Sequence, residues 1–263
     1  MSVSRRIDRW FGRMSPGVVA MQPGRGPSQG TGHKTASHKY IGEVVYGGLD
    51  GIITTFAVVS GVAGANLSSG IVLILGLANL LADGLSMGVG AYFSSKSDHE
   101  YYEAERARET QQVRANPKEE RHELEEIYVG KGYSTQDAAT LVEIQSKHEE
   151  LFVDAMMIHE LDMHPDDREP MVSGLTTFLA FQVAGAVPLM AYFSGRFFWP
   201  MPEATEFYWS VALTALALFS LGAAKVLVTT RHWFRSGLEM MLVGGLAAIV
   251  AYMVGFLLQG LQG

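Results

Sequence analysis

Residues 44–65 read VVYGGLDGIITTFAVVSGVAGA, an apolar run with a single charged side chain, Asp50. A helix needs roughly 20 apolar residues to cross a bilayer, so this run is long enough. A second run, residues 70–94, follows after Ala65-Asn66-Leu67-Ser68-Ser69, which is too short for anything but a turn. The two runs predict a pair of antiparallel membrane-spanning helices.

Three further apolar runs occupy residues 171–195, 207–229 and 237–259. Only 18% of the 263 residues are charged, against a usual share of about 25%. The sequence therefore predicts an all-α membrane protein with five transmembrane helices rather than a soluble globule. An odd number of spans places the two termini on opposite sides of the membrane.

The distribution of Lys and Arg predicts the orientation. The basic N-terminal segment, the charged stretch after the second span, and the loop of Arg231 and Arg235 share one side, whereas the other side has only Arg196. Cytoplasmic loops carry the excess of Lys and Arg, so we expect the N-terminus and the charged stretch to be cytoplasmic. Short loops and the lack of an apolar leader in residues 1–38 favour a bacterial inner membrane, or the vacuolar membrane if the cell is eukaryotic.

The charge pattern divides the chain into four parts, because 20 of the 27 Asp and Glu lie between residues 96 and 170. We expect a disordered basic tail (1–38), transmembrane helices one and two (39–95), a cytoplasmic helical insert (96–168) and transmembrane helices three to five (169–263).

The insert is predicted to hold three helices. The first runs from Ser97 to Asn116, because a proline disfavours helix in the residue before it. The second starts at Pro117, which suits a first helical turn, and ends near Gly130 and Gly132. The third is capped by Ser134 or Thr135 and continues to about Met163.

Composition excludes several classes of function. The chain has no Cys, which rules out disulfides, thiolate metal sites and cysteine catalysis. A net charge of −7 argues against a nucleic-acid partner. No arrangement of nucleophile, base and oxyanion donors is evident, so we expect no enzymatic activity.

Five charged side chains lie inside the apolar runs or at the end of one: Glu43, just before the first run, and Asp50, Asp83, Lys225 and Glu239 within the runs. A charge at the bilayer centre costs about 2.5–3.5 kcal/mol on insertion scales, so each needs an explanation. Asp50 either pairs with a neighbouring helix or binds an ion. Glu43 is either hydrated or functional, Lys225 and Glu239 are expected to pair, and Asp83 is open to both interpretations.

Met87 lies in the second span between Gly84 and Gly88, a spacing that lets helices approach closely. A single methionine in a membrane helix usually serves packing. Its thioether is also a soft ligand, and a thioether with a carboxylate suits Fe²⁺ better than Ca²⁺ or Mg²⁺.

The insert offers a denser group of ligand types. Glu120 and Glu123 share a helix face, Glu109 lies one helix earlier, and Met156 and Met157 precede Glu160 by one turn; the candidates are therefore Glu109, Glu120, Glu123, Met156, Met157 and Glu160. The alternative is a solvated acidic surface with methionines in the core. That alternative is favoured for the other glutamates, namely Glu119, Glu125, Glu126, Glu149 and Glu150.

Residues 119–122 also contain one Glu-x-x-His, half of the di-iron pattern of ferritin-like bundles. The second copy is missing. A membrane-anchored di-iron oxidase or metal sensor is therefore the alternative function.

Three ordered motifs resemble the vacuolar iron transporter family: GLDGIITTFAVVSG (48–61), SMGVGAY (86–92) and DAMMIHEL (154–161). The resemblance extends from about residue 40 to the C-terminus and includes VPL (187–189) and SGLE (236–239).

This resemblance implies a homodimer with five spans per subunit, a cytoplasmic insert and an ion path between subunits. The implied activity is proton-coupled export of Fe²⁺ from the cytosol, with Mn²⁺, Zn²⁺ and Co²⁺ as further candidate substrates and no permanently bound cofactor. Asp50 and Met87 fall on the membrane path, and Glu43 falls nearer its cytoplasmic mouth. The six insert candidates fall on the family's metal-binding positions.

The chain departs from the family pattern at three positions. Gln112 stands where the insert has an acidic residue, Asn79 stands where plant-type members have a glutamate, and Lys39 replaces an acidic residue before the first span. An amide is a weaker, neutral ligand, so the number of metal ions in the insert is left open.

Overall fold

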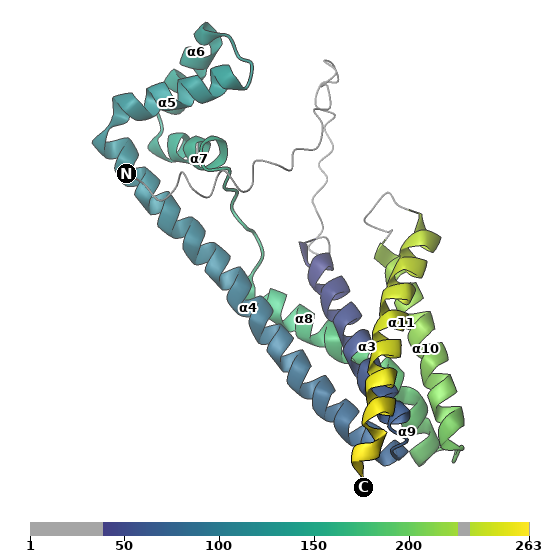
Figure 1. Cartoon of the computed structure of the whole chain (residues 1–263). Coiled ribbons are helices and arrows are strands. Elements are labelled where there is room, and N and C mark those ends of the chain that lie inside the picture. The colour runs from purple at the N-terminus through teal and green to yellow at the C-terminus, as the bar shows by residue number, and fades with distance from the viewer. Residues whose placement is uncertain (1–38, 226–231, 263) are drawn as a thin grey trace. The chain divides into compact units, whose positions relative to one another are not determined.

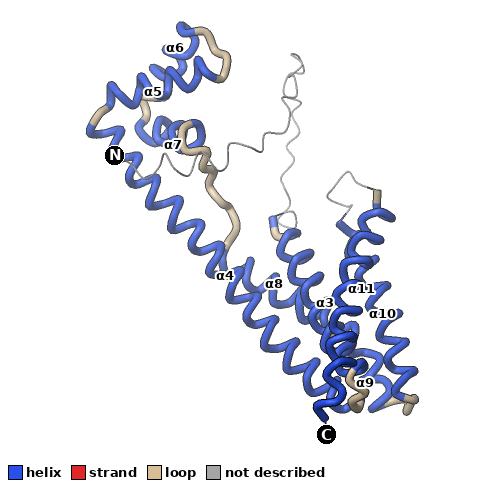
Figure 2. Tube along the Cα trace, viewed as in Figure 1, coloured by secondary structure: helices blue, strands red, loops and turns tan. Residues whose placement is uncertain are grey.

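The computed structural model describes residues 39–225 and 232–262, and every regular element within them is a helix (Figures 1 and 2). Five segments are long and apolar enough to cross a membrane: α3 (Ile41–Gly64), α4 (Ser69–Ala115), α8 with α9 (Pro170–Gly185 and Met190–Phe197), α10 (Glu203–Ala224) and α11 (Trp233–Leu258). The five predicted spans are confirmed. The predicted tail and the loop residue Arg231 lie outside the described residues.

The short connection between α3 and α4 is a turn, as predicted. Asn66 has a φ of 56°, in the left-handed region that Asn tolerates better than most residues. The Leu67 N–H then donates to the Val62 carbonyl oxygen at 3.1 Å, which closes the end of α3.

Helix α3 packs most extensively on α8, and glycines permit the contact. A β-carbon on Gly51 would lie 2.5 Å from the Phe181 carbonyl oxygen, and one on Gly185 would lie 2.8 Å from the Gly51 carbonyl oxygen. Both distances are shorter than van der Waals contact, so only glycine fits without a backbone shift. The two backbones therefore touch, as at small-residue interfaces between membrane helices.

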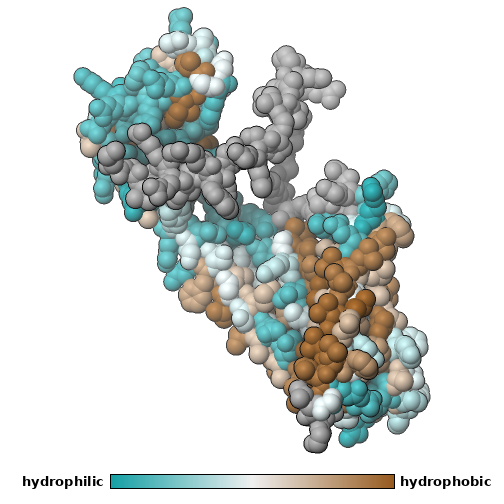
Figure 3. All heavy atoms as spheres, viewed as in Figure 1, coloured by the Kyte–Doolittle hydropathy of each residue, from teal (hydrophilic) through white to brown (hydrophobic). Residues whose placement is uncertain are grey.

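Apolar residues of α3, α4 and α8 form the core of the membrane region, among them Phe56, Val59, Leu80 and Phe181. The outward surface is also apolar, and on α11 it includes Leu242, Leu246, Ile249, Met253 and Phe256 (Figure 3). An exposed apolar surface of this extent is unusual for a soluble monomer and suits lipid.

The third span bends at Pro188. Helix α8 ends at Gly185, a 3₁₀ turn covers Val187–Leu189, and α9 follows. Proline has no N–H and its ring clashes with the preceding turn, so the helix cannot run straight. Ser210 of α10 donates to the Pro188 carbonyl oxygen at 2.7 Å, which satisfies an acceptor left open at the bend.

The first insert helix is not a separate element, contrary to the prediction of a start at Ser97. Helix α4 runs without a break from the second span to Ala115. The sequence between the two predicted helices contains no Gly or Pro, and the first strong helix-ending signal is Asn116-Pro117. Helix α5 (Pro117–Gly130) follows, as predicted.

The single third insert helix predicted to reach Met163 is wrong. The structure has α6 (Thr135–Gln145) and α7 (Glu149–His159), separated by a turn. Ser134 caps α6 by accepting the Asp137 N–H at 3.1 Å. The turn allows both short helices to bury apolar side chains in one core, which Val142 and Phe152 share with Leu124 of α5.

Replacing Gly51 by Ala should destabilise the protein, because the new methyl group meets backbone atoms that cannot move aside independently. We expect a loss of about 1–3 kcal/mol, as for other overpacked interiors. Thermal unfolding of the purified protein in detergent measures the change.

The matched control is Gly245→Ala on α11, where a β-carbon meets nothing within 4 Å. This change should leave the melting temperature the same or slightly higher, because Ala favours helix. Equal melting temperatures for the two variants would contradict the proposed backbone contact.

Candidate functional site

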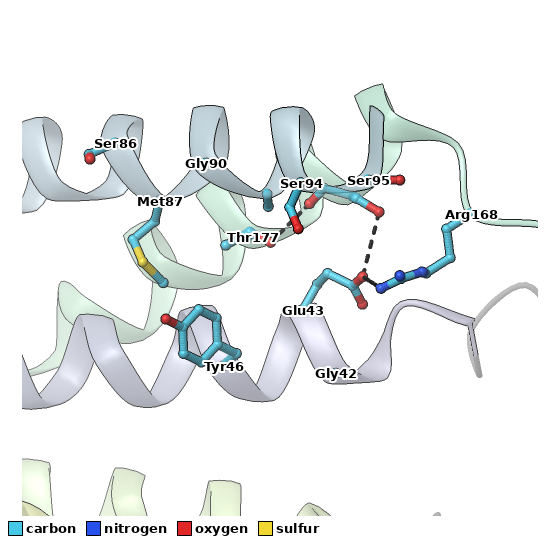
Figure 4. A pocket seen from close by; sticks show the side chains of 12 residues that line it. Gly42, Glu43, Tyr46, Ser86, Met87, Gly90, Ser94, Ser95, Arg168 and Thr177 are labelled. Carbon is cyan, nitrogen blue, oxygen red and sulfur yellow. Dashed lines mark hydrogen bonds and ion pairs between the residues drawn. The ribbon is translucent and has the colours of Figure 1, made fainter. Parts of the chain in front are cut away.

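A cavity of about 490 Å³ lies between α3, α4 and α8, close to where the chain enters and leaves the insert. It is lined by Gly42, Glu43, Tyr46, Ser86, Met87, Gly90, Ala91, Ser94, Ser95, Arg168, Ser173 and Thr177. Two residues that the sequence predicted on the ion path, Glu43 and Met87, thus line one cavity. The Met87 side chain extends from α4 toward Tyr46 of α3 (Figure 4).

The Glu43 carboxylate is held by an ion pair. Its side chain is 11% exposed, and Oε1 lies 3.0 Å from Nη1 of Arg168. Ser173 also donates to Oε1, at 3.5 Å (Figure 4). Glu43 is therefore both ion-paired and at the wall of a cavity large enough for water, so its hydrated and functional alternatives both stay open.

Asp50 lies about two turns further along α3 and does not line this cavity. It is half-buried, and its carboxylate has no hydrogen bond or ion pair within residues 39–225 and 232–262. The Asp50 carboxyl group is repelled by the negative charge of Asp83, a second carboxylate, which belongs to α4. The structure therefore brings two acidic groups together inside the membrane region, and the ion-pair alternative for Asp50 is not seen.

Half-buried functional groups follow both helices. We call the set Glu43, Asp50, Thr54, Asn79, Asp83 and Met87 the polar seam. On α4 its members are spaced i, i+4, i+8, so they share one side of the helix. The adjoining side carries Gly84 and Gly88, which pack on α8. Packing of the small residues on α8 thus turns the polar seam toward the space between α3 and α4.

In the insert, three carboxylates converge. Glu109 of α4, Glu120 of α5 and Glu160 at the end of α7 each offer an oxygen within 4.8 Å of the others. Glu109 is 2% exposed and Glu120 is 6% exposed. One oxygen of each of the three residues is buried without a hydrogen-bond partner. We call these three residues the insert cluster.

Burial and mutual repulsion act on the protons of the insert cluster. Burial raises the pKa of Glu109 to about 7, and the charges of Glu160, Glu120 and Glu123 contribute in the same direction. The pKa values of Glu120 and Glu160 are raised as well, first by burial and then by neighbouring carboxylates. Convergent carboxylates of this kind have the chemistry to hold a divalent cation, which would supply the missing positive charge.

The other insert candidates lie differently. Glu123 is exposed, although its charge acts on all three members of the insert cluster. Met156 and Met157 are 0% exposed and belong to the insert core, so a packing role accounts for their position. Their role as metal ligands stays a prediction.

The two residues of the Glu-x-x-His motif, which suggested the di-iron alternative, do not face the insert cluster. Glu119 and His122 are both exposed, and His122 lies 3.3 Å from Glu126 on the helix surface. Glu120, one residue later, is the side chain that faces the insert cluster. The Glu-x-x-His spacing is therefore a coincidence of an acidic helix.

Sequence reasoning missed Arg168, which contacts Glu43 and lines the cavity. The available signal was one basic residue within the acidic run Asp166-Asp167-Arg168-Glu169, directly before a span. The predicted pair of Lys225 and Glu239 stays a prediction, because Lys225 adjoins residues 226–231, which are not described.

Comparison with known proteins identifies the family. The model of the VIT family matches residues 41–256. A vacuolar iron transporter of Toxoplasma gondii is 40% identical over 232 residues, which cover 86% of this chain and 77% of that protein. Vacuolar iron transporter 1 of Arabidopsis thaliana is 33% identical over 233 residues, covering 86% of this chain and 91% of the relative. A match of this length, with relatives covered along most of their length, means that the chain belongs to the VIT family, whose members compared here are named vacuolar iron transporters.

Proposed function

We propose that this protein moves Fe²⁺ out of the cytosol in exchange for protons, with Mn²⁺ and other divalent transition metals as further substrates. The observation that carries the proposal is the pair Asp50 and Asp83. Two half-buried carboxylates lie on adjacent helices of a bundle of candidate membrane spans, the charge of Asp83 acts on Asp50, and neither has a basic partner among the residues described. Ionisable groups in that setting are costly and mark ion or proton pathways.

The relatives supply the nature of the substrate. The Toxoplasma and Arabidopsis proteins are named for iron transport. Met87 is consistent with such a substrate, because its thioether lines the same cavity as Glu43. Soft thioether donors favour late first-row ions over Ca²⁺ and Mg²⁺, and they also admit Zn²⁺ and Co²⁺.

Competition between protons and metal at the seam carboxylates provides the coupling. A metal site needs deprotonated ligands, so an ion bound by Asp50 excludes its proton, and a proton excludes the ion. Acid on the far side of the membrane then favours metal release there. The same carboxylates carry protons back, which makes the transporter an antiporter.

A second copy of the chain completes the path. The polar seam is only half-buried in a single chain, and lipid is a poor neighbour for Asp50 and Asp83. A homodimer that places the two seams face to face would remove them from lipid and double the number of carboxylates. We propose this arrangement, with the N-terminus and the insert cytoplasmic.

The insert captures the ion before transport. The insert cluster supplies three carboxylates, Glu123 adds charge at its edge, and Met156 and Met157 lie one turn before Glu160. We propose all six as metal ligands of a site that loads and empties, so no cofactor is held permanently. No enzymatic step is assigned to the protein, and the choice between bacterial and vacuolar membranes stays as predicted.

Replacing Asp50 by Asn should abolish transport, because the amide carries no charge and exchanges no proton. Proteoliposomes that hold a metal-sensitive dye, with and without a pH gradient, measure ion movement. Size-exclusion chromatography checks that the variant folds.

Glu150→Gln is the control, since it removes one exposed carboxylate of the insert that belongs neither to the polar seam nor to the insert cluster. It should transport at the native rate. Unchanged, proton-coupled transport by Asp50→Asn would remove the proposed site.

Replacing Glu109, Glu120 and Glu160 together by Gln should weaken capture without stopping transport. We expect KM for Mn²⁺ or Fe²⁺ to rise about tenfold, equivalent to about 1.4 kcal/mol, while the maximal rate changes little. Initial rates across a range of ion concentrations separate the two parameters.

The control triple variant replaces Glu119, Glu125 and Glu126 by Gln, which removes the same charge from the same helical insert. Those side chains are exposed or half-buried and lie outside the insert cluster. If both triple variants raise KM equally, the insert acts only by its overall charge.

Metal should stabilise the protein more at about pH 7.5 than at about pH 5.5. The pKa of Glu109 is raised from 4.5 to about 7 in the folded protein. Its contribution to stability is therefore complete below about pH 4.5 and is lost as the pH rises through about 7. A divalent cation binds the ionised carboxylates and restores stability, by about 2.7 kcal/mol at 100 times Kd.

Thermal unfolding with Mn²⁺ or with EDTA at the two pH values measures this difference. The Glu109, Glu120, Glu160→Gln variant should lose both the pH dependence and most of the metal effect. A larger Mn²⁺ effect at the acid pH would contradict the assignment.

A further inference from the structure

Arg168 is the one basic side chain among the described residues that line the cavity. It belongs to the segment that joins the insert to α8, and its guanidinium contacts carboxylates from three places. Nη1 lies 3.0 Å from Glu43 of α3, Nη2 lies 3.9 Å from Asp98 of α4, and Nη2 lies 2.7 Å from Asp166 of its own segment. A permanent cation therefore stands beside the acidic group at the insert-side end of the polar seam (Figure 4).

Arg168 and Glu43 would keep different numbers of partners if the contact between them were broken. Asp166 accepts from Nε at 2.9 Å, from Nη2 at 2.7 Å and from the Arg168 backbone N–H at 3.0 Å. The hydrogen bonds from Arg168 lower the pKa of the Asp166 carboxyl, so this anchor remains ionised. Arg168 thus keeps its main partner if Glu43 is released, whereas Glu43 would retain only Ser173 at 3.5 Å.

A further polar residue belongs to the wall of the same cavity. Ser95 is 3% exposed, and its buried hydroxyl has no hydrogen-bond partner among the residues that the structure describes. It comes from α4 and lines the cavity together with Glu43 and Arg168. A buried hydroxyl without a partner is costly, so the wall of the cavity carries one unsatisfied polar group.

We propose that Arg168 is an exchangeable counter-ion of Glu43: it neutralises that carboxylate when no metal is present and must release it, while held by Asp166, before a divalent ion enters. This inference rests on the proposed transport function and adds a residue that sets the affinity of the entry step. It makes ion entry a competition between two cations for one carboxylate.

The test compares three single variants, Arg168→Ala, Arg168→Lys and Glu43→Gln. A fourth, double variant combines Glu43→Gln with Arg168→Ala. Removing the competing cation should lower KM for Mn²⁺ presented on the insert side by about threefold to tenfold, as for a partly buried ion pair. Arg168→Lys keeps the charge and should keep KM near the native value. In the Glu43→Gln background, Arg168→Ala should leave KM unchanged.

Arg114→Ala is the matched control, because Arg114 forms an arginine–carboxylate pair with Glu149 on the insert surface, away from the cavity. It should leave KM unchanged. If Arg168 were only a structural clamp, Arg168→Ala would lower the maximal rate, leave KM unchanged and do so with or without Glu43. That result would overturn the proposal.

A binding measurement separates this proposal from transport itself. Mn²⁺ binding to the full chain is followed by electron paramagnetic resonance, with Glu109, Glu120 and Glu160 replaced by Gln to silence the insert cluster. Tighter binding with Arg168→Ala that disappears with Glu43→Gln supports the counter-ion role even if no ion crosses the membrane. Unchanged Mn²⁺ affinity overturns the role even if transport is intact.

Discussion

The contact between α3 and α8 at Gly51 and Gly185 is the constraint on which the membrane region depends. Two helices whose backbones touch leave no freedom for either to rotate, so the direction of every other side chain on α3 is fixed. Asp50 lies beside the glycine face, and Glu43 accepts a hydrogen bond from Ser173 in the first turn of α8. Helix α4 meets α8 through glycines of its own, and its seam residues are fixed in the same way. Steric packing therefore positions Asp50 and Asp83, whereas Glu43 is also held by its ion pair with Arg168.

The same logic explains how a carboxylate can persist unpaired in the membrane region. Packing free energy from the apolar core around Phe56, Val59 and Phe181 is spread over many contacts. That packing free energy offsets the unfavourable free energy of placing Asp50 and Asp83 close enough for their charges to repel each other. In the insert, the core around Leu124 and Phe152 supports the buried carboxylates of Glu109 and Glu120. Both regions hold acidic groups without a basic partner among the described residues, which is the premise of the proposed cation sites.

Much of this arrangement was predictable from sequence, for identifiable reasons. The lengths of the apolar runs predicted the five spans, and the Asn116-Pro117 step predicted the end of α4, because both signals are local in the sequence. Helical spacing grouped Glu120 with Glu123, yet the structure turns Glu120 inward and leaves Glu123 exposed, since tertiary packing decides which edge of a face is buried. The division of the third insert helix and the contact of Arg168 with Glu43 depend on residues far apart in the chain. Spacing within one helix carries no information about such contacts.

The length of α4 has a mechanical consequence. Its 47 residues form one rod of about 70 Å at 1.5 Å per residue. Met87 and Asp83 lie on the half that crosses the membrane, and Glu109 lies on the half that projects beyond it. The contacts of Gly84 and Gly88 with α8 act as a fulcrum for this lever. A tilt of about 5° around Gly88 displaces the Ala115 end, about 40 Å further along the rod, by about 3.5 Å. Small rearrangements in the lipid phase are thus magnified in the aqueous phase, and a force applied to the projecting arm is felt at Met87.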